Sequence, residues 1–348
     1  MHQFPFQKNK SLSLEIHKLF FSMFSSLKHR NNKQKYYFLN YLSLLIPDFI
    51  FRCRLKIKLN SLKKFDLEYI KRRVNYYNKL SKKNNLIKVE KSLESFKIKN
   101  YHRTYFFDTY EYTRFFEKKL KLKMLFGDIT HSPDLPSIVK SRPINDKNHN
   151  SILMKLNKVR HFTYTNDSNK FDDKINKLIG RSAITKKHKK RIDFFNIYFN
   201  HPLCDLGAIN KDTPYPKWLK NKISIEDHLK FKFIMCVEGV DVATNLKWVM
   251  SSNSIAVMPK PKIESWFMEN MLIPEKHYIE IKEDYSDVES KIEFYIKNPE
   301  KCKRIIKNAN DYVMQFKNNE RENLISLLVL EKYFHFTDQR EKTSLLDY

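Results

Sequence analysis

The residues Glu238, Gly239, Val240 and Asp241 follow the largely apolar run FKFIMCV, which has the length of a buried strand and ends at Val237. The chain contains only four glycines, against a usual share of about 7%, so a glycine here indicates a backbone requirement. Glycine lets a backbone approach a phosphate closely, and the free N–H groups at the start of a following helix favour an anion. The two carboxylates suit hydroxyl groups of a ribose or sugar. The stretch therefore predicts a site for a phosphate-bearing sugar or nucleotide; the alternative is a structural turn with solvated acids.

The elements around this stretch alternate in type. Strands are expected at residues 231–237, 254–258 and 277–281, and helices at 243–252, 263–270, 286–298 and 302–316. Ser286 and Glu289 form a capping-box pattern, and Asn298 with Pro299 opens the last helix. Strands that alternate with helices predict a parallel sheet, which binds its ligands at the carboxyl ends of the strands. Gly239 stands at such an end.

The first half of the chain carries a weaker pattern. Aromatic residues recur at helical spacing in residues 101–120, and residues 82–100 read as a charged connector with a short strand. Short apolar runs at 123–126, 137–139 and 151–156 have the rhythm of strands joined by loops. The run from Tyr36 to Leu59 is apolar, interrupted and flanked by basic residues. It fits a helix in the headgroup layer of a membrane, or a helical hairpin packed on the next domain.

The composition limits the class of protein but does not identify its binding partner. A chain of 348 residues with 41% hydrophobic content can bury a full core and has room for two or three domains. Its formal net charge of +27 attracts nucleic acid, anionic membrane or acidic sugars and phosphates, although an AT-rich genome would also enrich lysine. The four cysteines lack C-x-x-C spacing, which indicates a reducing compartment. Neither a signal-peptide core at residues 1–10 nor an uncharged run of about 18 residues is present.

Three longer blocks carry a likeness to a known family: EGVDVATNLKWVMSSNSIAVMPKP, ESWFMENMLIPEKHYIEIKEDYSDVESKI and FGDITHSPDLPSIVKSRPI. Together with NKVRHF and HPLCDLG they resemble glycosyltransferase family 90, and most closely its bacterial lipopolysaccharide-type members. The resemblance implies an α/β fold of GT-B architecture, in which two Rossmann-like domains face a cleft. The expected division is a basic helical segment at 1–90, an acceptor-side domain at 91–172, a nucleotide-sugar-binding domain at 173–320 and a helical tail at 321–348.

The family's chemistry implies an inverting transfer from a nucleotide sugar, expected to be a UDP-sugar, to a hydroxyl group without metal or other cofactor. The sequence agrees in one respect, since it contains no D-x-D triplet to hold a divalent cation. Cationic side chains and a helix N-terminus would then neutralise the leaving diphosphate. Asp128 matches the family's catalytic aspartate, which takes the proton of the attacking hydroxyl. Asp134 is the alternative base, and Asp128 as a mere turn cap is the alternative role.

The resemblance also assigns donor-binding residues. Arg181 matches the arginine of the family's W-R-G block, although Gly180 and Ser182 depart from that block, and Arg191 matches a second arginine; guanidinium groups suit phosphate oxygens. The remaining expected donor-binding residues are Glu238, Gly239, Val240, Asp241, Ala243, Asn245 and Lys247. Asn245 replaces an arginine of the protein-modifying relatives, which favours a glycan or lipid-linked acceptor. His131, His161 and His277 lack metal-ligand spacing and are expected to be structural or hydrogen-bonding.

The sequence thus predicts a glycosyltransferase that acts on lipopolysaccharide core or a related bacterial surface glycan. We expect a cytoplasmic enzyme peripheral to the inner face of the inner membrane, with its basic N-terminal segment against anionic lipid. A catalytically degenerate glycan-binding relative is one alternative. A nucleic-acid-binding protein is another, but it rests on charge alone, because no zinc-finger spacing, RRM signature or heptad-backed basic region is visible; we expect no nucleic-acid partner.

Overall fold

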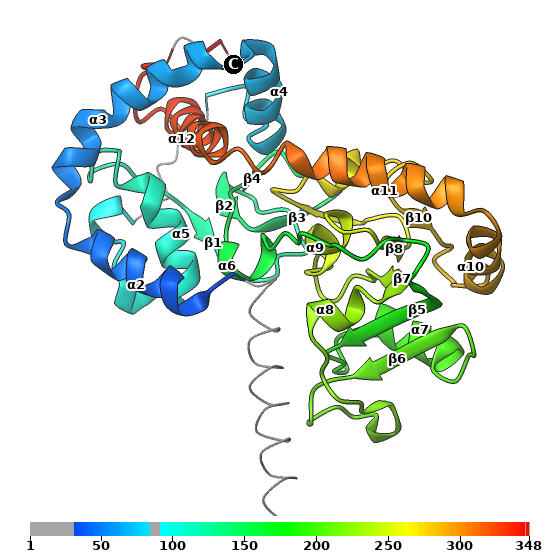
Figure 1. Ribbon diagram of the computed structural model, residues 1–348. Coiled ribbons are helices and arrows are strands. Elements are labelled where there is room, and N and C mark those ends of the chain that lie inside the picture. The colour runs from blue at the N-terminus through cyan, green and yellow to red at the C-terminus, as the bar shows by residue number, and fades with distance from the viewer. Residues whose placement is uncertain (1–30, 84–90, 345, 348) are drawn as a thin grey trace, which may run out of the picture.

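In the computed structural model, which describes residues 31–83, 91–344, 346 and 347, three sheets are joined by helices (Figure 1). The expectations for residues 1–30 and 84–90 lie outside the described residues. Of the connector expected at 82–100, the described part forms an isolated bridge from Ser92 to Lys121 and two short 3₁₀ helices rather than a strand, η2 (Leu93–Ser95) and η3 (Ile98–Asn100).

The largest sheet has five parallel strands in the order β10-β8-β7-β5-β6. Its strands are β5 (Ile175–Ser182), β6 (Cys204–Ala208), β7 (Phe231–Met235), β8 (Ile255–Met258) and β10 (Ile279–Glu280). The parallel sheet predicted from the alternating pattern is therefore confirmed, and β5 and β6 extend it beyond the expected strands. The surrounding helices are α7 (Lys189–Tyr198), α8 (Ile225–His228), α9 (Leu246–Met250), α10 (Val288–Lys297), α11 (Pro299–Met314) and the 3₁₀ helix η4 (Pro216–Trp218).

A second, three-stranded parallel sheet has the order β1-β2-β4. It is formed by β1 (Met124–Leu125), β2 (Ser137–Val139) and β4 (Ser151–Leu153), and each strand lies within an apolar run predicted as a strand. The helices around it are α2 (Lys33–Leu44), α3 (Asp48–Asn60), η1 (Ser61–Lys64), α4 (Leu67–Tyr77), α5 (Arg103–Thr113) and α6 (Lys158–His161). The aromatic pattern at 101–120 is confirmed as helix α5.

The helix α12 (Asn319–Phe336) returns from the five-stranded sheet to the helices around the smaller sheet. It packs against α4, α5 and α3, whereas the preceding α11 packs against α9 and β8, and Figure 1 shows α11 running over the larger sheet toward α12, which lies beside α4. Glu322 on α12 is buried and forms an ion pair of 2.9 Å with Arg73 on α4. Its other oxygen accepts a hydrogen bond of 2.6 Å from the indole N–H of Trp266. This buried group joins α4, α12 and the chain after β8.

A two-stranded antiparallel sheet links the half of the molecule that contains the smaller parallel sheet with the half that contains the larger one. Its strands are β3 (Ser141–Pro143) and β9 (Ile263–Ser265). The helix predicted at 263–270 is therefore wrong. Its first residues pair with β3, where Arg142 and Glu264 form a buried ion pair of 2.8 Å, and Met268 adopts a left-handed φ of 55°. A helix cannot accommodate either feature; only the 3₁₀ turn η5 (Glu269–Met271) remains.

The first residues of the two helices after β10 differ in one detail from the expectation. α10 begins at Val288 after the N-cap residue Asp287, which makes no side-chain cap. The hydroxyl of Ser286 instead donates to Asp284 at 2.9 Å, so the predicted capping box is wrong although the helix is confirmed. Pro299 does open α11. None of the helices in the described ranges is both long and apolar enough to cross a membrane.

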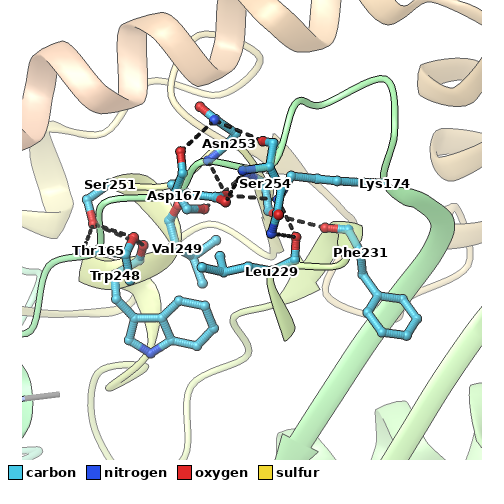
Figure 2. A network of polar contacts seen from close by, with 12 residues as sticks. Thr165, Asp167, Lys174, Leu229, Phe231, Trp248, Val249, Ser251, Asn253 and Ser254 are labelled. Carbon is cyan, nitrogen blue, oxygen red and sulfur yellow. Dashed lines mark hydrogen bonds and ion pairs between the residues drawn. The ribbon is translucent and has the colours of Figure 1, made fainter. Parts of the chain in front are cut away.

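The segment that enters β5 is fastened to the ends of α9 and β7 by a buried polar network (Figure 2). Asp167 and Lys174 form an ion pair of 2.8 Å between side chains that are almost fully buried. Asp167 also accepts a hydrogen bond of 2.9 Å from the backbone N–H of Asn253, and Lys174 donates to the hydroxyl of Ser254 at 3.0 Å. The network fixes the point where the chain passes from the smaller sheet to the larger one.

Candidate functional site

Residues that follow strands of both parallel sheets meet around one buried lysine. Lys140, directly after β2, lies 2.5 Å from a carboxylate oxygen of Asp128, which follows β1. It also lies 2.7 Å from Asp241, in the loop after β7, and Asp241 accepts a further hydrogen bond of 2.9 Å from Ser141. The carboxyl ends of parallel strands therefore contribute to one site, as the sequence pattern predicted for Gly239 and its neighbours.

The two carboxylates differ in their access to solvent. The side chain of Asp128 is 45% exposed, whereas that of Lys140 is 3% exposed and that of Asp241 is 8% exposed. Burial alone would lower the pKa of Lys140, but the negative charge of Asp241 and the hydrogen bonds to both carboxylates raise it above the ordinary lysine value. Lys140 is thus a buried cation paired with one exposed and one buried carboxylate.

The backbone before Asp128 requires glycine. Gly127 adopts a φ of +113°, although a side chain there would meet no atom within 4 Å, so the requirement is conformational rather than steric. Asp134, the alternative base, has an exposed side chain, and its carbonyl oxygen accepts a hydrogen bond from the side chain of Asn150 at 2.7 Å. The structure brings Asp128, and not Asp134, into contact with Lys140.

A group of cationic side chains lies beside these carboxylates. Arg191 on α7 donates to the carbonyl oxygens of Val237 and Ala183 at 3.3 and 3.2 Å. Burial and the charge of Arg160 lower the pKa of Arg191 to about 10. Burial, followed by the charge of Arg191, also lowers the pKa of His188, the N-cap residue of α7. Arg191 and Arg160 therefore place two positive charges near the start of α7.

Gly239 makes room for this cationic group. A Cβ atom at position 239 would lie 3.0 Å from Nη2 of Arg191 and 3.3 Å from Cδ2 of His188. The glycine therefore permits a close approach, here by a guanidinium group. The expected sharp turn from Gly239 into a helix is wrong, because α9 begins only at Leu246. Asn245 donates to the carbonyl oxygen of Met235 at 2.9 Å and closes the intervening loop onto the end of β7.

Several expected donor-binding residues are engaged within the protein. The carboxylate of Glu238 accepts from the backbone N–H groups of Lys262 and Ile263 at 3.0 and 3.1 Å and pairs with Lys190. Lys247 forms a buried ion pair of 2.6 Å with Glu269. Ala243 is buried, whereas Val240 is 37% exposed. Glu238, Asn245 and Lys247 thus hold the loops around the site in place.

Arg181 at the end of β5 is held by a neighbouring strand. Its Nη2 lies 2.9 and 3.0 Å from the two carboxylate oxygens of Asp205 on β6, and its Nη1 donates to the Asp205 carbonyl at 2.7 Å. Both carboxylate contacts come from the single nitrogen Nη2, and Nε has no hydrogen-bond partner among the described residues. The structure therefore directs Arg181 toward β6, while Arg191 is directed toward Gly239.

The histidines differ in their surroundings. His161 on α6 is buried, and burial, then the charges of Lys247, Lys140 and Arg160, hold its pKa well below the ordinary value. Its Nε2 has no hydrogen-bond partner among the described residues. His277 accepts a hydrogen bond from the N–H of Ile273 at 2.9 Å, and His131 is exposed. Within the described ranges, no three His, Cys, Asp or Glu side chains are grouped to hold a metal ion.

A cavity of about 60 Å³ lies at the carboxyl ends of β7 and β8, lined by Val237, Glu238, Ala243, Met258, Pro259 and Tyr285 among others. It is much smaller than a typical ligand pocket, so it can receive only part of a ligand in this conformation. Glu238 and its ion-pair partner Lys190 are both among the lining residues.

Three residues of the site were not predicted: Lys140, Arg160 and His188. Lys140 directly follows the strand expected at 137–139, so the rule that located Gly239 at a strand end could also have located it. Arg160 stands in the block NKVRHF, which carries part of the family resemblance, so that likeness could have indicated it. His188 has no such signal, because it is the N-cap residue of α7 and lies far in sequence from the strand ends.

Comparisons with known proteins show the family of the chain. A family profile described as Glycosyl transferase family 90 matches residues 168–339. The chain is 38% identical over 265 residues to the O-glucosyltransferase LpsA of Dichelobacter nodosus, a match that covers 76% of this chain and 82% of that protein. It is also 28% identical over 155 residues to the uncharacterized protein 179R of Invertebrate iridescent virus 6, covering 42% of this chain and 12% of that protein.

The family profile covers α7, Gly239 and Asp241, and the likeness to LpsA extends over most of both chains. These matches, with the parallel sheets and the group around Lys140, identify the chain as a glycosyltransferase that belongs to glycosyltransferase family 90.

Proposed function

We propose that this glycosyltransferase carries out an inverting transfer from a UDP-sugar to a hydroxyl group of lipopolysaccharide core or a related bacterial surface glycan. The observation that carries the proposal is the half-exposed carboxylate of Asp128, held by the buried Lys140, whose second partner Asp241 acts on Arg191 together with Arg160. A base and a cationic site for a leaving group are the two parts that such a transfer needs.

In this mechanism Asp128 accepts the proton of the acceptor hydroxyl while the hydroxyl oxygen attacks the anomeric carbon. The bond from that carbon to the diphosphate oxygen breaks, and attack from the opposite face inverts the configuration. Arg191 and Arg160 stabilise the negative charge that develops on the diphosphate. Lys140 fixes the orientation of Asp128 from the buried side of the site, and it also holds Asp241 on the donor side.

The proposed architecture is GT-B, with the acceptor side at residues 91–172 and the donor side at 173–320. It is supported by the two parallel sheets, whose strand ends contribute Asp128 and Asp241 to one site. The donor would cover the mouth of the cavity beside Ala243 and Glu238. Residues from 321 onward would close the acceptor side, since α12 packs there.

Independence from metal is part of the proposal. Its support is the sequence, which contains no D-x-D triplet, and the cations near Gly239, which offer another way to neutralise a diphosphate. Arg181 would act indirectly, through its ion pair with Asp205. No cofactor besides the sugar nucleotide is required.

The choice of the first donor to test follows the relative LpsA. LpsA is called an O-glucosyltransferase, so UDP-glucose is the first donor to test. A lipid-linked glycan acceptor would place the enzyme at the cytoplasmic face of the inner membrane as a peripheral protein.

The experiment is thermal unfolding of the purified protein with UDP-glucose, other UDP-sugars and UDP, all in EDTA, compared with Asp128→Asn. A ligand that binds only the folded state raises the melting temperature. We expect one UDP-sugar to stabilise both proteins and to be consumed only by the wild type, with turnover of the variant reduced about 10²- to 10⁴-fold. Stabilisation without turnover in either protein would indicate a degenerate binding protein. Salt-dependent binding of DNA or RNA without any nucleotide-sugar effect would contradict the proposal altogether.

A further inference from the structure

The helix α2 and its junction with α3 expose an unusual number of apolar side chains. α2 contains no buried residue. From Phe38 to Ile50 the exposed apolar side chains, hereafter the elbow, are Phe38 (63%), Leu39 (51%), Tyr41 (40%), Leu42 (45%), Leu45 (78%), Ile46 (43%), Phe49 (57%) and Ile50 (36%). Single exposed apolar residues are ordinary, but a run of neighbours marks an interaction surface.

The elbow is firmly attached to the protein by polar contacts on its inner side. Arg114 on α5 donates to the carbonyl oxygens of Ser43 and Ile46 at 3.0 and 2.6 Å. Asp48 at the start of α3 accepts from the hydroxyl of Tyr110 at 2.6 Å. Carbonyl oxygens of the bend therefore accept hydrogen bonds from the protein body. These contacts hold the bend in a position that leaves Leu45 and Phe49 exposed.

The position of the elbow leaves it free to meet a large surface. α2 and α3 form the outer edge of the molecule on the side away from the five-stranded sheet (Figure 1). The hairpin expected from the run at 36–59 is therefore packed on the body through α5, and it also keeps an apolar outer face. The two interpretations of this run are compatible.

The charges around the elbow favour an anionic partner. Between residues 31 and 60 the only acidic residue is Asp48, which is paired with Arg114. The basic residues in the same interval are Lys33, Lys35, Arg52, Arg54, Lys56 and Lys58. Arg54, Lys56 and Lys58 are exposed beside Ile57, itself 70% exposed. A second copy of this chain would bring two such basic rows together, which disfavours self-association.

We propose that the elbow docks on an anionic lipid bilayer. Its apolar side chains enter the boundary between headgroups and acyl chains, and Arg54, Lys56 and Lys58 contact lipid phosphates. Apolar burial combined with basic residues is the physical basis of interfacial membrane binding. The proposal concerns attachment rather than chemistry, so it holds whether or not Asp128 is the catalytic base.

The test uses the full chain and sedimentation with vesicles of phosphatidylcholine, with and without phosphatidylglycerol. We expect binding only to the anionic vesicles. Leu45→Ser combined with Phe49→Ser should weaken it at least about tenfold, because two large apolar side chains no longer leave water. The matched control is Ile197→Ser with Met314→Ser, at positions 53% and 58% exposed elsewhere on the surface, and it should bind like the wild type.

A second pair of variants tests the charges. Arg54→Gln with Lys56→Gln should also weaken binding and reduce its dependence on salt, whereas Lys211→Gln with Lys276→Gln, at exposed positions elsewhere, should change neither. Melting temperatures and transfer to a detergent-dispersed acceptor should stay at the wild-type level in all variants, which separates this proposal from the catalytic one.

Three results would overturn the proposal. The elbow variants could bind vesicles as tightly as the wild type. Deletion of residues 1–30 could abolish binding while the elbow variants retain it, which would assign the contact to that segment. The wild type could form a dimer that the elbow variants lose, without any vesicle binding, which would assign the surface to a second copy.

Discussion

Lys140 is the residue that connects the chemistry of the two sheets. It contacts Asp128 at 2.5 Å and Asp241 at 2.7 Å while its own side chain is 3% exposed. A buried cation between two carboxylates offsets their mutual repulsion and fixes both in place. The geometry of the proposed base therefore depends on a residue that does not itself need to touch the acceptor.

We expect Lys140→Met to lower kcat by on the order of 10²-fold, because Asp128 loses its fixed orientation and the buried Asp241 loses its counter-charge. Steady-state transfer assays, with chemical unfolding to follow stability, measure the effect. Lys147→Met, at an exposed position of the same region, is the control. An unchanged kcat with a lower stability would make Lys140 a structural residue only.

Gly239 gives a second test at the scale of one atom. Gly239→Ala places a Cβ atom 3.0 Å from Nη2 of Arg191, which is the mobile end of a side chain, so the fold should be retained while the guanidinium shifts. We expect KM for the donor to rise about tenfold, the equivalent of one lost charged hydrogen bond, with little change in melting temperature.

The glycine at position 180 is the counterpart for this test. Its added Cβ would lie 2.9 Å from Leu206 and 3.1 Å from Met235 inside the sheet, so Gly180→Ala should lower stability without a selective effect on KM. If Gly239→Ala left KM unchanged, the link between Gly239, Arg191 and the donor would be refuted.

The site could be predicted in part from single residues. Sequence indicated Asp128, Gly239, Asp241 and Arg191, and the structure places all four near one another. The sequence could not show that the Glu238 carboxylate accepts a hydrogen bond from the backbone N–H of Lys262, or that Arg181 pairs with Asp205. Such choices depend on which neighbours the tertiary fold supplies, and local sequence does not contain them.

At the scale of elements, the sequence predicted a strand or helix correctly where the spacing of apolar residues matched one type of element. The strands near 124, 137, 151, 231, 255 and 279 and the helices α5, α10 and α11 were anticipated because apolar spacing and Pro299 are local signals. Residues 263–270 were assigned to the wrong element, since β9 exists through its pairing with β3. A long-range partner overrode the helical propensity there.

The junction of α2, α5 and α6 carries a buried carboxyl whose ionisation affects stability. Asp108 accepts from the hydroxyl of Tyr36 at 2.7 Å and from the N–H of Lys158 at 2.8 Å. Burial raises its pKa from 3.8 to about 6, in spite of the opposing charge of Lys158. Because the folded-state pKa is the higher one, the protonated carboxyl contributes stability below pH 3.8, and this contribution is lost as pH rises through about 6.

We therefore expect the free energy of unfolding of the wild type, relative to Asp108→Asn, to fall by up to about 3 kcal/mol between pH 4 and pH 7. Urea unfolding of both proteins across this range measures the difference. Asp146→Asn, at an exposed position, serves as the control. A wild-type advantage that instead grew with pH would show that hydrogen bonds to the ionised form dominate at this junction.

At the scale of the whole molecule, the two halves are joined by elements that cross between them. The pairing of β3 with β9 and the hydrogen bond from Trp266 to Glu322 on α12 both connect the smaller sheet's half with the chain after β8. The helices α11 and α12 form a third connection (Figure 1). The relative position of Asp128 and Asp241 depends on these three connections, because the two residues come from different sheets.

The crossing of α12 makes a prediction about fragments. The region matched by the family profile, 168–339, includes α12 but excludes α3, α4 and α5, which cover that helix. Most of α12 is buried in the full chain, including Leu324, Leu328 and Phe334, so the isolated fragment would expose a continuous apolar helix. We expect fragment 168–339 to aggregate or to unfold without cooperativity, as judged by size-exclusion chromatography and circular dichroism.

Fragment 168–317, which ends before α12, should be less prone to aggregation. Co-expression of residues 31–167 with 168–348 should restore a soluble complex that stabilises with the donor. If fragment 168–339 alone were a monomer with a sharp melting transition, α12 would be a stable part of the donor side, and the division into halves argued above would be wrong.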